Sequence, residues 1–361
     1  MMENNPILRI KENIENINNK SFNIYFFTID SKGAPNGYVS YIYESALCLH
    51  KMGYNVNMLY QDTDFIGVES WLGEEYANIP HFNIEKDKVS ITASDFLFIP
   101  EFYSNVMSQT TKLPCKKVVI TQNFNYLNQA IPAGASWKNF GIKDCIVTTN
   151  RLDEQIKSIF PSIKTHKVEP FINENIFNKS NEPKKLVINV VTKDNTEINQ
   201  IIKPFFWKYP MYSWVSFREL RNLPKSEFAK YLKESVFTIW YDRDTEFGYA
   251  PIEAIKCGSI VIGKVPENIP DWMLENGELK NNAIWFFDIN DVHRLIAGGI
   301  ESFINDNIPQ ELYKEMDKMA DKYTYNDFKK NITEVYINTI FEERKKELES
   351  YISILENKIN N

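Results

Sequence analysis

Short apolar runs, rich in aromatic and β-branched residues, recur along the first half of the sequence between polar and helical stretches. A strand buried on both faces of a parallel sheet has such a continuous apolar run. We therefore predict strands in the segments 22–29, 55–60, 95–99, 117–121 and 144–148. A helical pattern over 38–52 that stops at Gly53 joins the first two, so the segment predicts a β–α–β unit whose first turn contains Gly33 and Gly37.

The pattern breaks at residues 178–185 (NKSNEPKK), which are polar and aperiodic and contain Pro183, and we predict a linker there. Beyond it the alternation resumes, with predicted strands at 186–191, 236–240, 259–262 and 283–287 and predicted helices at 227–234, 251–257 and 292–305. Strands that alternate with helices are typical of a parallel sheet covered on both faces. The sequence therefore predicts an α/β protein with two Rossmann-like domains, residues 1–178 and 179–325.

Amphipathic helices are predicted at both ends of the sequence, a leading helix within 1–20 and a charged C-terminal helix within 326–361. Each has an apolar seam with spacings of three and four residues, formed by Ile7, Ile10, Ile14 and Ile17 in the first and by Leu348, Ile352, Leu355 and Ile359 in the second. These seams are shorter than the about three to four heptads that indicate a coiled coil. Three interpretations stay open: the helices pack on the body of the protein, on each other, or on a second copy to give a homodimer.

Composition narrows the classes of function. The 361 residues are enough for two cores, and 43% hydrophobic and 25% charged residues are ordinary for a globular protein. The net charge of -7 disfavours nucleic acid as a partner, although a local basic patch would still allow it. The four cysteines and four histidines show no metal-ligand spacing, so we expect reduced thiols and no metal. Because no apolar leader and no run of about 20 apolar residues is present, we expect a cytoplasmic protein without a transmembrane segment.

The most informative segment is 245–263, TEFGYAPIEAIKCGSIVIG. A strand ends in a loop, a helix is predicted to begin at Pro251, and Gly258 ends that helix before the next strand. Loops at the carboxyl ends of strands bind ligands in α/β sheets, and the free N–H groups of a helix start suit a phosphate. Gly248 allows a close backbone approach, and Glu253, expected in the first helical turn, could bind a ribose diol. The alternative is an ordinary joint with a glutamate that compensates the helix dipole.

This segment resembles the donor-site signature of retaining GT-B glycosyltransferases, the large glycosyltransferase family 4. The matching residues occur in the family's order: Phe247, Gly248, Pro251, Glu253, Ala254, Cys257, Gly258, Val261 and Ile262. Weaker landmarks of the family lie at residues 33–37, 53–56, 167–177 and 323–336, which together extend over nearly the whole chain. The resemblance implies two Rossmann-like domains facing each other across a cleft and a C-terminal helix, within 326–361, that crosses back to the first domain. It also implies transfer of a hexose from a nucleotide sugar, such as a UDP- or GDP-sugar, to a hydroxyl acceptor, without a metal or other cofactor.

The resemblance further implies two catalytic residues. In the family a first glutamate, eight positions before the second, lies near the hydroxyls of the transferred sugar. That position is Thr245 here, so we assign the role to the adjacent Glu246, with Asp244 as the other candidate. Lys193, after the first strand of the second domain, would neutralise the donor diphosphate, but no basic residue follows it five positions later as in the family.

The remaining implied site residues bind the donor or the acceptor. The implied donor-binding residues are Glu253 at the ribose, Phe247, Gly248 and Tyr249 at the sugar and diphosphate, Arg218 as a compensating cation, and Gly37 from the first domain. On the acceptor side, Gln122 and Asn123 stand where many relatives have a histidine, and they could hydrogen-bond a sugar hydroxyl. Aromatic residues in 71–76 and 124–137 could stack on sugar rings, although core packing is the simpler role for each.

Two other functions remain open at this stage. A GT-B enzyme could instead glycosylate a modified DNA base, which a basic groove in the first domain would favour. Alternatively, the altered first glutamate and the missing second basic residue could mark a degenerate domain that serves as a non-catalytic binding or assembly module.

Overall fold

The computed structural model describes residues 5–193 and 195–360 and divides the chain into two compact units. The first unit ends at Glu169 and resumes at Phe328, while the second spans Pro170–Asp327. The division therefore falls earlier than the predicted boundary after residue 178, because Ile172 and Phe177 are buried in the core of the second unit. Each unit has its own parallel sheet with helices on both faces, which confirms the predicted pair of Rossmann-like domains.

The first unit contains a seven-stranded sheet with the order β3-β2-β1-β4-β5-β6-β7, and all its neighbouring strands are parallel. Its strands are β1 (Asn23–Phe27), β2 (Asn55–Tyr60), β3 (His81–Asn83), β4 (Phe96–Pro100), β5 (Lys116–Thr121), β6 (Asp144–Val147) and β7 (Lys164–Lys167). The central strands β1, β4, β5 and β6 are almost completely buried, as their continuous apolar sequence predicts.

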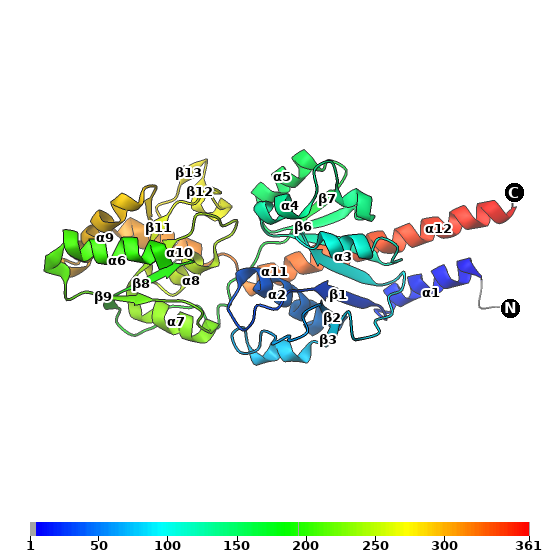
Figure 1. The fold of residues 1–361 in the computed structure, drawn as a ribbon, viewed down its shortest axis with the longest axis horizontal. Helices are drawn as coiled ribbons and strands as arrows, with labels where there is room; N and C mark the ends of the chain where they lie inside the picture. The colour runs from blue at the N-terminus through cyan, green and yellow to red at the C-terminus, as the bar shows by residue number, and fades with distance from the viewer. Residues whose placement is uncertain (1–4, 194, 361) are drawn as a thin grey trace. The chain divides into compact units, whose positions relative to one another are not determined.

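Helices cover both faces of this sheet (Figure 1). They are α2 (Gly37–Lys51), α3 (Ser104–Gln109), α4 (Phe124–Ala130), α5 (Asn150–Ile159) and α11 (Tyr325–Ile332), with the short 3₁₀ helices η1 (Glu74–Asn78) and η2 (Trp137–Phe140). Side chains of α3, α4 and α5 share one core cluster with one side of the strands. The other side packs against the returning C-terminal helix, where Tyr336 contacts the rings of Phe26 and Phe98.

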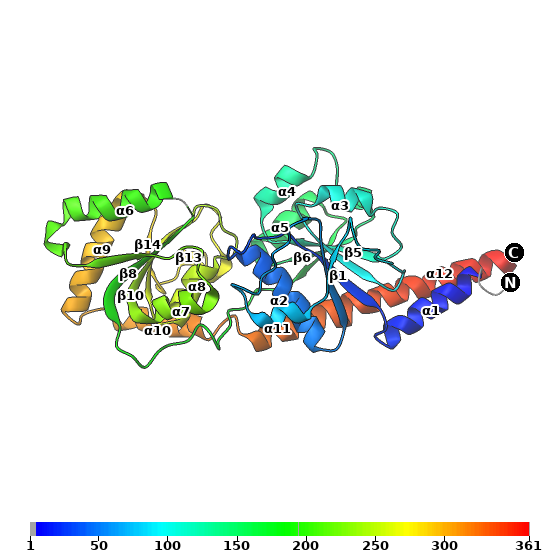
Figure 2. The ribbon, with the colours of Figure 1, turned by 60° about the horizontal axis from the view of Figure 1, so that its bottom comes forward.

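The C-terminal helix is continuous and returns to the first unit. It consists of α11, the π-helical segment η5 (Thr333–Phe341) and α12 (Glu342–Asn360). The leading helix α1 (Pro6–Asn18) lies beside α12 (Figure 2), and Ile17 of α1 and Leu348 of α12 are buried. The terminal helices thus pack on each other, which is one of the three interpretations of their seams. Self-association through them stays a prediction.

The second unit contains a five-stranded parallel sheet with the order β14-β11-β10-β8-β9. Its strands are β8 (Lys185–Thr192), β9 (Ser216–Glu219), β10 (Ser235–Tyr241), β11 (Ile260–Lys264) and β14 (Ile284–Phe286), and a small antiparallel pair is formed by β12 (Leu274–Glu275) and β13 (Glu278–Leu279). The fully buried β10 is the middle strand of the sheet, and β8, the first strand of the unit, lies beside it.

Helices again lie on both faces of the second sheet (Figure 2). Two of them, α6 (Asn195–Lys208) and α9 (Ile289–Ile304), pack together on one face. On the other face lie α7 (Lys225–Glu234), α8 (Tyr249–Lys256) and α10 (Gln310–Ala320), while η3 (Pro210–Tyr212) and η4 (Asp271–Met273) are short 3₁₀ helices in connecting loops. Within the described parts of the chain, no helix is both long and apolar enough to cross a bilayer. All four cysteines are buried as free thiols.

Candidate functional site

The second sheet has a topological switch point between β8 and β10. The strand β9 lies on one side of β8 and β10 on the other, and the helices that follow β8 and β10, α6 and α8, lie on opposite faces of the sheet (Figure 2). Ligands of parallel α/β sheets bind outside the carboxyl ends of the strands at such a point. The residues that follow β8 and β10 therefore form the candidate site of this unit.

Lys193 and the loop after β10 meet at the switch point. The Lys193 ammonium nitrogen lies 2.7 Å from a carboxylate oxygen of Asp242 and donates a 3.2 Å hydrogen bond to the backbone oxygen of Asp244. The Lys193 side chain is 73% exposed, whereas that of Asp242 is 10% exposed. Burial raises the pKa of Asp242, although the charge of Lys193 opposes that shift. The site thus presents an anchored but accessible cation to an incoming anion.

Two cations that the sequence analysis did not single out lie at the same edge. Arg243 follows β10 and pairs with Glu197 at 3.5 Å, with a side chain that is 62% exposed. Lys264 is the last residue of β11, and burial, followed by the charge of Arg243, lowers its pKa. The carboxyl ends of β8, β10 and β11 therefore each supply one cation. A sequence motif could not identify Arg243 as a site residue. The three strand ends are far apart in the sequence, and only the strand order of the sheet brings them together.

The loop after β10 is held by the segment that follows β11. The side-chain amide of Asn268 donates a 3.2 Å hydrogen bond to Glu246, whose side chain is buried. The indole N–H of Trp272 donates a 2.6 Å hydrogen bond to the backbone oxygen of Phe247. Because both bonds come from a neighbouring loop, Glu246 is fixed at the switch point rather than extended into solvent. The predicted residues Lys193, Glu246 and Phe247 therefore occur together.

Gly248 makes the turn from this loop into α8. Its φ of 74° and ψ of 77° are in the left-handed region, and a Cβ atom there would lie 3.3 Å from the ring of Trp240. The ring of Phe247 packs edge-on against Tyr249 at 5.0 Å and Tyr323 at 5.1 Å. The turn therefore needs a glycine for both conformation and space.

We predict that Gly248→Ala destabilises the second unit by about 1–2 kcal/mol, the cost of a left-handed residue with a side chain, plus the cost of displacing Trp240. Urea unfolding followed by circular dichroism measures the change. Gly277→Ala is the matched control, because Gly277 also has a positive φ of 83° but nothing within 4 Å of an added Cβ. An equal loss in the two variants would show that the contact with Trp240 contributes nothing.

Glu253 lies in α8, and its position corrects one expectation. The helix begins at Tyr249, so Pro251 is its third residue and Glu253 is in the second turn rather than the first. Gly248 provides the N-terminal cap residue, which is why the helix starts two positions before the proline. The Glu253 side chain is only 6% exposed. Glu253 is thus a buried carboxylate in the helix that starts at the switch point.

Arg218 does not join this group. It lies on β9, where its guanidinium is 3.2 Å from Glu234 and stacks over the ring of Tyr231 at 4.3 Å. Glu234 directly precedes β10, so this ion pair faces the amino end of the sheet, opposite the switch-point loops. The expectation that Arg218 compensates for a missing donor-site cation is therefore wrong.

The first sheet has its own switch point, between β1 and β4. Glu101, which directly follows β4, lies at this point. The buried Glu101 carboxylate accepts hydrogen bonds from the backbone N–H groups of Gln122 at 3.0 Å and Asn123 at 2.8 Å, and from the hydroxyl of Tyr38. The Gln122 side chain donates to the backbone oxygen of Tyr38 at 3.0 Å. Glu101 was not predicted as a site residue, although an acidic residue directly after a buried strand was a usable signal.

The other predicted residues of the first unit, Asn123 and Gly37, lie at the N-terminal ends of helices, where they have structural roles. The Asn123 side chain caps α4 through the N–H of Asn125. Gly37 is the first residue of α2, whose N–H groups at residues 38 and 39 are capped by Asn36. Gln122 and Asn123 are thus present at the predicted edge, but their amide groups already hold the local backbone.

Aromatic rings occur beside this cluster. Tyr38, Phe102 and Tyr126 lie within 6.1 Å of one another by ring centroids, and Tyr126 is 42% exposed. Trp71 and Trp137, in contrast, are buried in the core, so stacking on a sugar is excluded for them. Among the residues that the structure describes, no group of three or more His, Cys, Asp or Glu side chains is placed to hold a metal ion.

The proteins that resemble this chain were found by comparison of structures and not of sequences. No protein-family model matches the sequence, and no curated protein sequence matches it. Among solved structures, sucrose-phosphate synthase from Thermosynechococcus elongatus is similar over 88% of this chain and 99% of its own, with 11% identity and a TM-score of 0.62. A pneumococcal O-GlcNAc transferase in complex with UDP and GlcNAc is similar over 90% and 99%, with 11% identity and a TM-score of 0.61.

A third similar structure is the catalytic domain of starch synthase IV from Arabidopsis thaliana, bound to ADP and acarbose. It matches 91% of this chain and 99% of its own, with 9% identity and a TM-score of 0.54. These similarities extend over about nine tenths of this chain and nearly the whole length of the other proteins. Together with the two parallel α/β units, they show that this chain has the GT-B fold of glycosyltransferases.

Proposed function

We propose that this protein is a retaining glycosyltransferase that moves a sugar from a nucleotide-sugar donor to a hydroxyl group of a saccharide, glycolipid or other glycan. The observation that carries the proposal is that Lys193 and the loop with Glu246, which leads into the helix of Glu253, meet at the β8/β10 switch point of a GT-B fold. Two similar structures contain a nucleoside diphosphate, UDP in one and ADP in the other, which supports this class of donor.

The cations at the switch point suit the leaving group. A nucleoside diphosphate gains negative charge as its bond to the sugar breaks, and fixed positive charge at that position lowers the barrier. Lys193 would be the closest contact, exchanging its Asp242 carboxylate for the diphosphate, with Arg243 and Lys264 as neighbouring charges. With three protein cations available, transfer without a metal is part of the proposal.

The two buried glutamates would orient the rest of the donor. Glu253 would accept hydrogen bonds from the ribose diol, and Glu246 would hold hydroxyls of the transferred sugar. Acceptor attack on the face that the diphosphate leaves would retain the anomeric configuration. The departing phosphate oxygen would take the acceptor proton, so this route needs no side chain as general base.

The acceptor would bind in the first unit near Glu101. The carboxylate of Glu101 fixes the loop that carries Gln122 and Asn123, and the neighbouring Tyr126 offers an exposed ring for a sugar face. The non-catalytic alternative rested partly on a missing second basic residue. Arg243 and Lys264 now provide cations at that edge, which favours the enzyme.

Nucleoside diphosphate release tests the proposal. The protein is incubated with UDP-, GDP-, ADP- and dTDP-sugars and a mixture of saccharide acceptors, and the free nucleotide is measured. We expect nucleoside diphosphate to be released from the sugars of one nucleotide only. The rate of this release should be about 10²-fold lower in Glu246→Gln, the usual cost of losing one group that stabilises a transition state. Glu301→Gln, an exposed change on α9, is the control. Equal rates in Glu246→Gln and wild type would remove Glu246 from the mechanism.

A further inference from the structure

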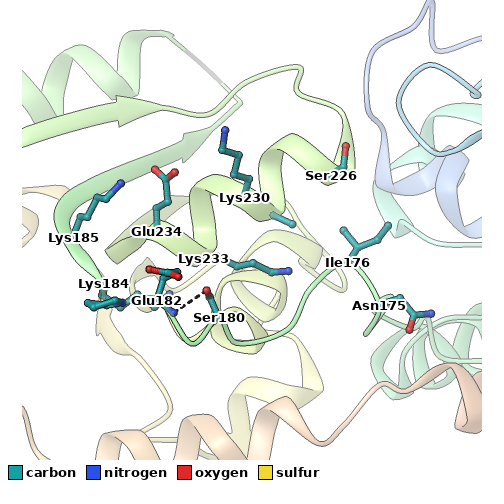
Figure 3. A pocket seen from close by; sticks show the side chains of 12 residues that line it. Asn175, Ile176, Ser180, Glu182, Lys184, Lys185, Ser226, Lys230, Lys233 and Glu234 are labelled. Atoms are coloured by element: carbon teal, nitrogen blue, oxygen red, sulfur yellow. Dashed lines mark hydrogen bonds between the residues drawn. The ribbon is translucent and has the colours of Figure 1, made fainter.

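A cavity of about 720 Å³ lies at the amino ends of the strands of the second sheet, at the end opposite the donor site. Figure 3 shows the side chains that line it. The segment 175–185, which leads into β8, forms one wall, and α7 forms the other. Lys185 begins β8 and Glu234 directly precedes β10, which places the cavity at the amino ends of these strands. The cavity therefore shares no residue with the candidate donor site.

The cavity is lined by four lysines that no carboxylate neutralises. Within the described parts of the chain, Lys184, Lys185, Lys230 and Lys233 have no carboxylate within ion-pair distance, although the protein carries a net charge of -7. Two glutamates also line the cavity. Glu234 is engaged with Arg218 at 3.2 Å, and Glu182 is exposed. The unopposed charge of the lining is thus positive.

Lys184 is the most constrained of the four lysines. Its ammonium donates hydrogen bonds to the backbone oxygens of Leu232 at 3.0 Å and Cys257 at 2.6 Å, and it has no charged partner among the described residues. Burial lowers the pKa of Lys184 to about 8, with the nearby charge of Lys179 acting in the same direction. A bound anion would supply the opposite charge that this half-buried cation lacks.

We propose that this cavity is a second ligand site, which binds a small phosphomonoester such as a sugar phosphate. Lys230 and Lys233 project from α7, whereas Ser180 and Lys184 come from the segment opposite (Figure 3). Lysine ammonium groups and serine hydroxyls are ordinary phosphate donors. The volume is in the range of small-molecule sites and exceeds what a bare phosphate fills, so a polar organic body is expected beside the phosphate. This inference does not depend on the proposed transferase activity.

Calorimetric titration of the full chain tests the proposal with three probes: a hexose 6-phosphate, inorganic phosphate and the unphosphorylated hexose. We expect the hexose phosphate to bind, inorganic phosphate to bind more weakly, and the neutral hexose not to bind. The double variant Lys230→Ala/Lys233→Ala should raise the Kd of the hexose phosphate at least tenfold. Lys203→Ala, an exposed change on α6, is the matched control and should leave the Kd unchanged.

Two comparisons separate this site from the donor site. Glu253→Ala should leave the hexose phosphate affinity unchanged, and saturating UDP, GDP or ADP should not compete with it. If no phosphorylated probe binds, or if the double lysine variant binds as tightly as wild type, the proposal is overturned. Loss of binding in Glu253→Ala would overturn it as well, because the probe would then occupy the donor site. Phosphate binding that all variants share equally would be an adventitious ion only and would also count against the site.

Discussion

Lys193→Ala should lower kcat for nucleoside diphosphate release by about 10²–10³-fold, the usual cost of removing one group that stabilises charge in a transition state. Lys193 is the exposed cation at the switch point, and the loss of its charge would leave Asp242 facing the leaving diphosphate. Since the repulsion grows as the sugar bond breaks, kcat should fall more than KM rises. Steady-state kinetics with the active donor separate the two parameters.

Two further variants test whether the loss of activity is due to the charge at position 193. Lys193→Arg keeps the charge and should retain most of the activity, while Lys203→Ala removes an exposed lysine from α6 and should have no effect. The account of Lys193 fails if Lys193→Ala keeps wild-type kcat. It also fails if only KM changes, since Lys193 would then contribute ground-state binding alone.

Lys116→Met should destabilise the first unit by about 3–5 kcal/mol, the cost of breaking a buried ion pair from one side. The Lys116 ammonium lies 2.7 Å from Asp144 and 2.9 Å from Glu347, and both Lys116 and Asp144 are buried. Without Lys116, Asp144 would keep His166, at 3.0 Å, as its hydrogen-bond partner. Urea unfolding at pH 7 measures the loss, with the exposed Lys112→Met as the matched control. A change below about 1 kcal/mol would show that the cluster contributes little.

The destabilisation by Lys116→Met should depend on pH. Burial by itself would raise the pKa of Asp144, but hydrogen bonds from His166 and Lys116 and their charges outweigh it and lower that pKa. The pKa of Glu347 is lowered in the same way by Lys116 and Arg344. A lowered carboxyl pKa stabilises the folded state above the unfolded pKa of about 4, and this contribution disappears as pH falls through the folded value. The difference between Lys116→Met and wild type should therefore be full at pH 7 and shrink below about pH 4.

The same cluster explains how the C-terminal helix is attached to the first sheet. Arg344 donates hydrogen bonds to the backbone oxygens of Ala93 at 2.9 Å and Pro114 at 2.6 Å, and Glu347 pairs with Lys116. The sequence predicted a charged amphipathic helix, but not these partners, which lie more than 200 positions earlier in the chain. Such contacts could not be predicted, because they depend on which strand ends lie next to each other in the folded sheet.

The buried strands could be predicted because both of their faces are covered. β5 and β10 are continuous apolar runs, and their bounds agree with the prediction to within a residue. The edge strands β3, β7 and β9 were missed. They have three or four residues and read as polar sequence (HFN, KTHK and SFRE), because one side of an edge strand faces solvent.

Most of the candidate site could be predicted because one segment contains it, and Lys193 was predicted from its place after the first strand of the second unit. Glu246, Phe247, Gly248 and Glu253 lie in a single loop and helix, so a sequence pattern can identify them together. The start of α8 was misplaced because a proline suits the first helical turn, whereas the left-handed Gly248 fixes the actual start. Arg243 and Lys264 could not be assigned in this way, since their roles follow from strand order and not from neighbours in sequence. Glu101 directly follows the buried strand β4, and this position was a usable signal that was missed.

Binding of a nucleoside diphosphate is the most direct test of the donor site at the β8/β10 switch point. The thermal unfolding of wild type and Glu253→Ala is measured with UDP, GDP, ADP and dTDP, and Glu301→Ala on α9 is the control. A ligand at about 100 times its Kd should stabilise the fold by about 2.7 kcal/mol. We predict that one nucleotide raises the melting temperature of wild type and Glu301→Ala but not of Glu253→Ala. No stabilisation by any nucleotide, or equal stabilisation of Glu253→Ala, would contradict the account.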